Sequence, residues 1–134
     1  MTQGRLAEAL EHYRETLALR EALFATDGKN YRTRSALASS CWRTGNLLVS
    51  MGRAREAIPL LERAEALLAG PVQTFAQREE LANIRFTKGL AYGPKGKGFM
   101  ARARAEFAQL AREAPGREDF RERLLEIERA LRGK

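Results

Sequence analysis

The sequence predicts an all-α fold built from antiparallel helical hairpins that stack on one another. Three observations support this prediction. Ala, Leu, Glu and Arg dominate the 134 residues, and these residue types favour helix. Val, Ile and Thr are too sparse and scattered to build a sheet. Glycine followed by small residues recurs along the chain, as expected where copies of a helical hairpin pack closely.

The first three helices are predicted from apolar residues that recur every three to four positions. The first, 5–27, ends at a glycine that can adopt the left-handed cap conformation. The second, 31–51, and the third, 54–69, are separated by Gly52. Pro59 lies near the start of the third helix, where few backbone hydrogen bonds are lost. We therefore expect a mild kink there rather than a break.

Three further helices are predicted in the second half of the chain, over 74–92, 99–114 and 118–131. The segment Gly93–Gly98 between the first two is expected to be a flexible turn, because glycine and proline interrupt helices. The last helix has one apolar face and one strongly charged face. It is therefore expected to act as a solvating cap at the end of the stack.

An internal repeat is the strongest feature of the sequence. Residues 4–10 align with residues 52–58 at an offset of 48, and a further 46 residues lead from Gly52 to Gly98. In each copy a small residue is followed four positions later by a large one, on the same helical face. These pairs are Ala9 with Tyr13, Ala57 with Leu61, and Ala103 with Phe107.

This pattern resembles the tetratricopeptide repeat. The middle unit resembles it through Gly45, Leu48, Gly52, Ala57, Leu61 and Ala64, and the last unit through Gly89, Tyr92, Ala103, Phe107 and Pro115. Spacings of 46–48 exceed the usual 34 residues and are similar to the long repeats of kinesin light chains and bacterial signalling proteins. The chain departs from the family pattern at Cys41, Thr44 and Lys88.

The resemblance implies a single domain over 1–134, folded as a short right-handed superhelix. Its parts would be a lone second helix (5–27), two repeats (31–69 and 72–115) and a capping helix (117–132). It also implies a non-catalytic scaffold for protein–protein interaction, part of a larger signalling protein that carries a kinase or regulator domain. The first helices of such repeats line a concave groove that takes a peptide or partner domain.

The residues expected to face this groove come from the first helix of each repeat. They are Ser39, Trp42, Arg43, Asn46, Val49 and Ser50 in one repeat, and Asn83, Phe86, Thr87 and Leu90 in the next. An aromatic anchor beside arginine and asparagine is typical of recognition sites. The alternative is that Trp42, the only tryptophan, packs between helices as large aromatic side chains often do.

A net charge of +7 leaves a second hypothesis open, a basic platform for nucleic acid or another polyanion. The candidate contacts are Lys95, Lys97, Arg102 and Arg104. Most arginines, however, alternate with glutamates at helical spacing, which is typical of a solvated helix face. The glycines and lysines of 93–98 lack the G-x-x-x-x-G-K-[ST] pattern of a phosphate-binding loop. Nucleic acid is therefore the less favoured partner.

Catalysis, metals and cofactors are not expected. His12 and Cys41 are the only histidine and cysteine, which is too few for a structural zinc site, and neither lies in a recognisable catalytic motif. Glu79 and Glu80 are adjacent and so point in different directions on a helix. A single cysteine, no signal peptide and no apolar run of ~20 residues indicate a cytoplasmic protein without a membrane partner.

The first helix lacks the preceding helix that would complete its repeat. Leu10, Tyr13 and Leu17 would then be exposed, and contiguous exposed apolar residues usually mark a contact. The sequence therefore predicts either a homodimer through this face or a missing upstream partner segment.

Overall fold

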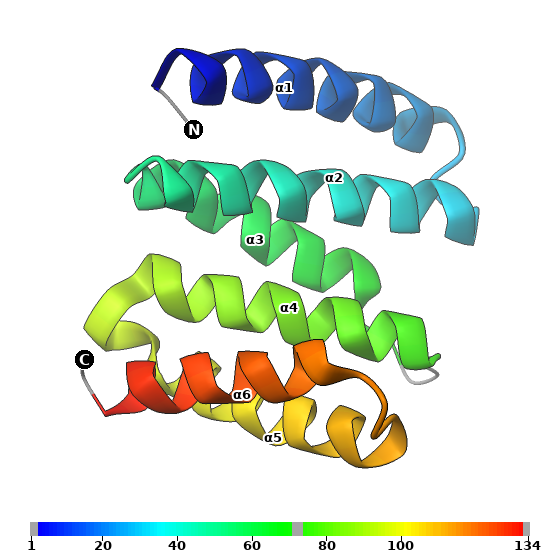
Figure 1. Ribbon diagram of the computed structural model, residues 1–134. Helices are drawn as coiled ribbons and strands as arrows, with labels where there is room; N and C mark the ends of the chain where they lie inside the picture. The colour runs from blue at the N-terminus through cyan, green and yellow to red at the C-terminus, as the bar shows by residue number, and fades with distance from the viewer. Residues whose placement is uncertain (1–2, 71–73, 133–134) are drawn as a thin grey trace. The chain divides into compact units, whose positions relative to one another are not determined.

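The computed structural model describes residues 3–70 and 74–132, and the regular structure in these ranges is helical (Figure 1). The predicted all-α class is confirmed, since no strand occurs among the described residues. The helices are α1 (Gln3–Thr26), α2 (Tyr31–Ser50), α3 (Ala54–Leu68), α4 (Phe75–Tyr92), α5 (Lys97–Glu113) and α6 (Glu118–Leu131), with one 3₁₀ helix, η1 (Gly93–Gly96).

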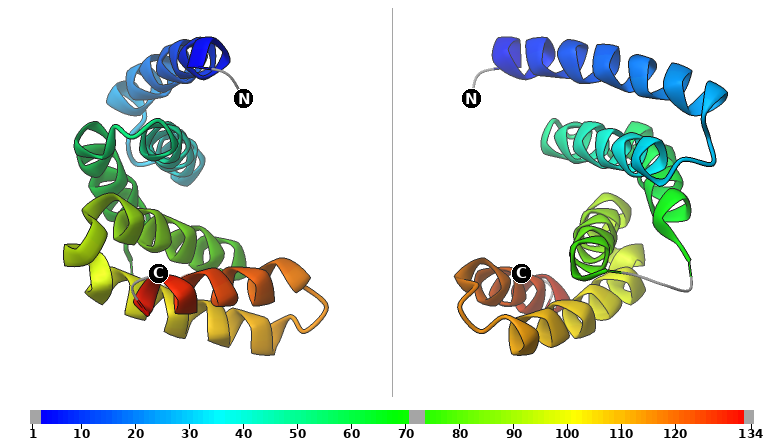
Figure 2. Two further views of the ribbon diagram at one scale, coloured as in Figure 1. Left: turned by 60° about the vertical axis from the view of Figure 1, so that its left-hand side comes forward. Right: turned by 90° about the vertical axis from the view of Figure 1, so that its right-hand side faces the viewer.

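The chain divides into two compact units, and the single domain expected over 1–134 stays a prediction. Unit 1 is Met1–Ala69 and unit 2 is Gly70–Lys134. Within unit 1, α1 packs on α2 and α2 on α3; within unit 2, α4 packs on α5 and α5 on α6 (Figures 1 and 2). Each helix therefore finds its main partner in the helix next to it in the sequence, as in a series of hairpins.

The hairpin of α2 and α3 depends on glycines at its turn and at its closest approach. Gly52 has φ of +75°, a left-handed conformation that glycine adopts without strain, and it lets the Arg53 N–H donate to the Leu48 carbonyl at 2.8 Å. A Cβ atom added at Gly45 would lie 2.9 Å from Leu61 Cδ2. Glycine at position 45 therefore leaves room for the Leu61 side chain where the two helices approach closely.

Two details of unit 1 follow from its local sequence. The Asn30 side chain accepts the Arg32 N–H at 2.8 Å and so caps α2, which fixes where the helix begins. Thr44, which stands where the repeat pattern favours leucine, is buried. Its hydroxyl donates to the Ser40 carbonyl at 2.7 Å, which satisfies the polar group inside the core. α3 continues as one helix through Pro59.

The core of unit 2 is a cluster of apolar side chains from α4, α5 and α6. Its buried members are Ala82, Phe86, Met100, Ala103, Phe107, Leu110, Phe120 and Ile127. Phe107 and Phe120 lie with ring centroids 6.0 Å apart, and Phe75 packs against Phe120 at 6.1 Å. Thr74 begins α4 with a capping box, in which its hydroxyl and the Gln77 side chain each bond the other's backbone N–H.

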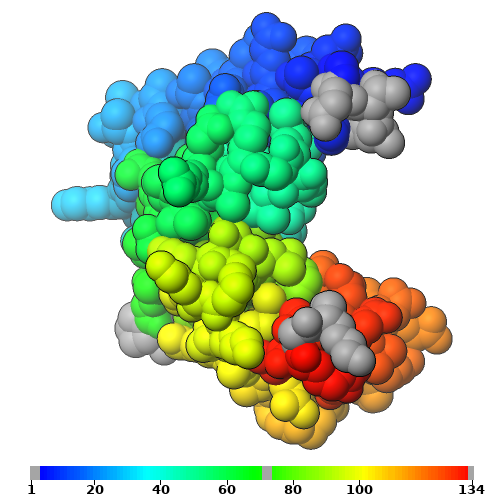
Figure 3. Space-filling view, turned by 90° about the vertical axis from the view of Figure 1, so that its left-hand side faces the viewer, coloured from blue at the N-terminus to red at the C-terminus, as the bar shows by residue number. Residues whose placement is uncertain are grey.

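The segment after α4 is more regular than predicted. Gly93, with φ of +63°, ends α4, and η1 leads directly into α5, which begins at Lys97 rather than at Phe99. The reason is a close backbone contact that sequence alone does not reveal. A Cβ atom at Gly96 would lie 2.9 Å from the Gly89 Cα atom, so only glycine lets the turn pack on α4. Figure 3 shows this end of α4 and η1 beside the C-terminal end of α6.

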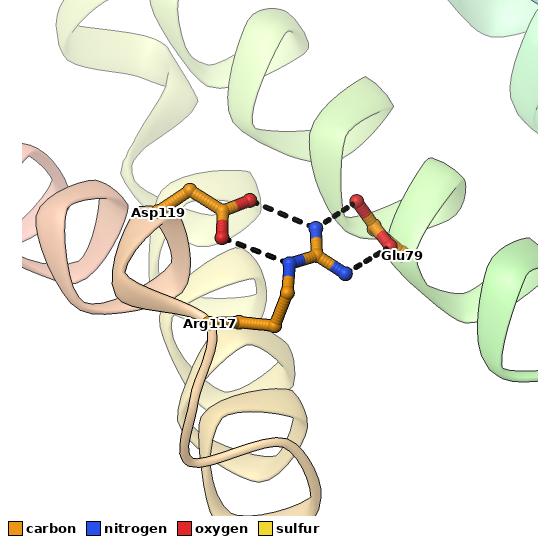
Figure 4. Close-up of polar contacts among 3 residues, drawn as sticks. All are labelled: Glu79, Arg117 and Asp119. Carbon is orange, nitrogen blue, oxygen red and sulfur yellow. Dashed lines mark hydrogen bonds and ion pairs between the residues drawn. The ribbon is translucent and has the colours of Figure 1, made fainter.

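Ion pairs tie the helices of unit 2 together on its surface. Arg117, in the turn before α6, donates to Glu79 of α4 at 2.8 Å and to Asp119 at 2.8 Å (Figure 4). Its guanidinium also lies 4.2 Å from the Phe120 ring centroid. The hydrogen bond from Arg117 lowers the pKa of Asp119. One arginine thus fixes the angle at which the last helix returns to the unit.

We expect acid to weaken unit 2 partly through Glu113 of α5. The hydrogen bond from Arg78 of α4, 2.9 Å from Nη1 to Oε1, and one from Gln109 lower the pKa of Glu113 from 4.5 to about 2. A lowered carboxyl pKa contributes stability that is fully present above pH 4.5 and is lost as the pH falls towards 2. Thermal unfolding between pH 2 and pH 5 should therefore depend less on pH in Glu113→Gln than in wild type.

Glu122→Gln is the matched control for this prediction. Glu122 is an exposed carboxylate of α6, and it forms no ion pair with any residue that the structure describes. This variant should keep the pH dependence of wild type. Equal slopes for Glu113→Gln and wild type would show that the Arg78–Glu113 pair does not contribute to acid sensitivity.

Candidate functional site

The strongest candidate site is a surface pocket between α1 and α2 of unit 1, with a volume of about 340 Å³. We call it the Trp42 pocket. It is lined by Tyr13 of α1 and by Trp42, Arg43, Asn46, Leu47 and Ser50 of α2. Four of the six groove residues predicted for this repeat therefore lie together in one pocket.

The pocket arises from helix periodicity and from the packing of α1. Trp42, Asn46 and Ser50 recur at intervals of four along α2, so they share one face of that helix. Tyr13 reaches the same place from the neighbouring helix. α1 is held by the burial of Leu10 and by an ion pair of 2.7 Å between Glu21 and Arg63 of α3.

A second ion pair lies one heptad away from the first. Arg14 of α1 approaches Glu56 of α3 at 3.4 Å, so the charges of the two pairs alternate between the helices. This alternation favours the observed position of α1 along α3, because a shift by one heptad would bring like charges together. Glu56 also accepts hydrogen bonds from Arg53, which lower its pKa. The ion pairs that position α1, and with it Tyr13, therefore lie outside the Trp42 pocket.

The lining of the Trp42 pocket combines apolar walls with one positive charge. Tyr13 is 38% exposed and Trp42 is half-buried, so both rings can be contacted from solvent. Arg43 is exposed, forms no ion pair with the described residues, and is the only charged residue of the lining. The Ser50 hydroxyl donates to the backbone carbonyl of Asn46 at 3.2 Å, and Asn46 itself is exposed.

The other predicted groove residues lie in different surroundings. Ser39 and Val49 are half-buried on α2 and do not line the pocket. In unit 2, Phe86 belongs to the core, and the buried Thr87 donates its hydroxyl to the Asn83 carbonyl at 2.9 Å. Leu90, which is exposed, lines a separate pocket of about 370 Å³ between the ends of α4, α5 and α6.

Two members of the Trp42 pocket were not among the predicted groove residues. Tyr13 was assigned to a self-association face, and Leu47 was not singled out. The repeat alignment could have indicated that Tyr13 is structurally important, because Tyr13 occupies the same repeat position as Leu61 and Phe107. Those two residues are buried by their own hairpins, whereas Tyr13 has no such partner among the described residues and remains accessible. Leu47 carries no comparable signal.

The predicted self-association face is covered in part. Leu10 is buried, Leu17 is half-buried, and Tyr13 lines the Trp42 pocket. Leu10 does not fit the expectation of an exposed face, because α2 packs along this side of α1. The most exposed large apolar side chains of α1 are instead Leu19, at 68%, and Leu23, at 55%.

The four basic residues proposed as polyanion contacts differ in their surroundings. Arg104 pairs with Glu128 at 3.5 Å, and Arg102 lines a pocket of about 300 Å³ that also contains Arg78 and Glu106. Lys97 lines the pocket at the end of α6, and Lys95 is exposed on η1. Lys97 and Arg102 therefore line two different pockets.

The described residues do not gather the side chains that a metal site requires. They contain no cluster of three or more His, Cys, Asp or Glu side chains that could hold a metal ion. His12 is exposed, with Nδ1 4.0 Å from Glu15. Cys41 is fully buried, and this burial raises the pKa of its thiol to about 11, which disfavours the reactive thiolate. Among the helices described, none combines the length and apolar character that a membrane span requires.

The chain is similar to a known protein family over the segment that contains its first helix. The family model described as Tetratricopeptide repeat matches residues 1–27, which include α1 and Tyr13. No curated protein and no solved structure matches the chain. The match covers the lone helix expected over 5–27, whereas the resemblance rests on residues of the middle and last units. Tetratricopeptide repeats generally mediate protein–protein interaction.

Proposed function

We propose that this chain is a tetratricopeptide-repeat scaffold, non-catalytic, that binds a protein partner, and that the Trp42 pocket receives a peptide or a surface segment of that partner. The observation that carries the proposal is the convergence of Tyr13, Trp42 and Arg43 in one pocket. Tyr, Trp and Arg are the residue types most enriched among the energetically dominant positions of interfaces. A role within a larger signalling or regulatory protein is part of the same proposal.

The distribution of charge supports this function over polyanion binding. Arginines of both units are paired with carboxylates, in the pairs Arg14–Glu56, Arg53–Glu56, Arg63–Glu21, Arg78–Glu113, Arg85–Glu106, Arg104–Glu128 and Arg117–Glu79. Paired arginines are poorly available to phosphates, because a carboxylate already occupies their donors. Binding to a partner protein should therefore weaken little between 50 and 200 mM salt, unlike binding to nucleic acid.

Trp42→Ala should abolish most of the affinity for the partner. Truncation of a central aromatic residue typically costs 2 kcal/mol or more, so we expect the Kd to rise by about thirtyfold or more. A partner captured from cell extract with the wild-type protein would be purified, and its Kd for each variant measured by calorimetry. Circular dichroism would verify that the variant keeps the helical content of wild type.

Tyr31→Ala is the matched control, because Tyr31 is an exposed aromatic residue of the same helix that does not line the pocket. It should leave the Kd unchanged. A Kd that is equal for wild type and Trp42→Ala would contradict the proposed role of the pocket. Binding that falls steeply with salt in both variants would favour the polyanion alternative.

A further inference from the structure

We infer that the Trp42 pocket selects a segment in which an apolar side chain lies next to a carboxylate. The inference rests on the proposed function and adds the chemistry of the occupant. It follows from the two parts of the lining, which are an apolar part formed by both helices and a positive part formed by α2 alone.

The apolar part has two facing sides. Tyr13 belongs to α1, whereas Trp42 and Leu47 belong to α2, so an inserted side chain contacts two different helices. The aromatic rings offer large contact areas and have few rotatable bonds, so they lose little entropy when an occupant binds. Tyr13 thus acts as a specificity residue, because without it the pocket has only one side.

The positive part is Arg43. Arginines that hold α1 on α3 already have carboxylate partners, as Arg14 has Glu56 and Arg63 has Glu21. Arg43 has no such partner among the described residues, and no carboxylate lines the pocket. The planar guanidinium matches a carboxylate with two parallel hydrogen bonds. A carboxylate beside the inserted apolar group would therefore neutralise the positive charge of Arg43, which no residue of the pocket lining neutralises.

The neighbouring polar residues fit the same occupant. Asn46 and Ser50 follow Arg43 along α2 and line the pocket at the surface. The Asn46 amide can donate to and accept from the backbone of an extended segment, and the Ser50 oxygen can accept from it. A segment with lysine or arginine at the same place would be repelled by Arg43, and a bare polyanion would leave the aromatic sides uncovered.

An array of capped octapeptides tests the inference directly. Two adjacent central positions are varied through all pairs of the twenty amino acids, and the flanking residues are Gly and Ser. The array is probed with wild-type protein and with Trp42→Ala. We expect apolar–acidic pairs to be enriched on the wild-type array and lost with Trp42→Ala.

Titration in solution then separates the two parts of the pocket. The fluorescence of Trp42, the only tryptophan, reports binding of the best peptide and of its counterpart with the acidic residue replaced by its amide. The amide should bind wild type about tenfold more weakly, as expected for loss of a charged hydrogen bond. Arg43→Gln should remove this difference, whereas Tyr13→Ala should weaken both peptides by a similar factor. Arg55→Gln, an exposed arginine of α3 outside the pocket, is the control for net charge.

The possible failures are distinguishable. Enrichment of uncharged or basic pairs, or a preference for acid over amide that persists in Arg43→Gln, would overturn the inference and leave the proposed function intact. Peptide binding that is unaffected by Tyr13→Ala would overturn the two-sided pocket. The absence of any Trp42-dependent peptide binding would contradict both the inference and the peptide mode of the proposed function.

Discussion

Phe107→Ala should destabilise unit 2 by about 3–5 kcal/mol, the range observed when a buried phenylalanine is truncated. Phe107 is 2% exposed and lies in the core cluster with side chains of α4, α5 and α6. Removal of its ring leaves a cavity and ends the contact with the ring of Phe120 at 6.0 Å. Because a small helical unit has little stability to spare, we expect its cooperative unfolding to be nearly lost at 25 °C.

Leu125→Ala provides the comparison for this prediction. Leu125 is 59% exposed on α6, so its truncation should change the free energy of unfolding by less than about 0.5 kcal/mol. Urea unfolding followed by circular dichroism measures both variants. Unfolding of unit 1 can be followed separately through the fluorescence of Trp42. Similar effects of the two substitutions would show that Phe107 does not organise the core of unit 2.

Gly96→Ala should cost about 3 kcal/mol or more, the upper part of the range for overpacking. The added methyl group would meet the backbone of Gly89, with its Cα atom 2.9 Å away. Backbone atoms cannot move aside as the end of a flexible side chain can. The turn would have to separate from α4, and α5 would shift with it, so the core around Met100 would be disturbed as well.

Gly98→Ala is the opposite case within the same short segment. Gly98 is helical, and an added Cβ atom would meet no atom within 4 Å outside its immediate surroundings. Alanine there should stabilise α5 by about 0.5–1 kcal/mol, because glycine loses more backbone entropy in a helix. Thermal unfolding of the two variants checks the pair. A loss of stability in both, or in neither, would contradict the close packing of Gly96 on Gly89.

The candidate site was predicted from the sequence only in part. The spacing along α2 places Trp42, Asn46 and Ser50 on one face, because that depends only on helix periodicity. The second side of the pocket, Tyr13, was not predicted as part of this site. It lies 29 residues earlier in the chain, and its place opposite Trp42 depends on how α1 packs on α2.

Local sequence features are sufficient to predict the helices, their order and the glycine turn of the central hairpin. These features depend on local periodicity, on capping residues such as Asn30 and on the conformational freedom of Gly52, all of which act within a few residues. The division of the helices into two compact units and the packing of Gly96 on Gly89 become visible only in the folded chain. Both features depend on contacts between helices. Such contacts require side chains whose volumes fit together and backbones that can approach closely, and no single sequence position encodes either property.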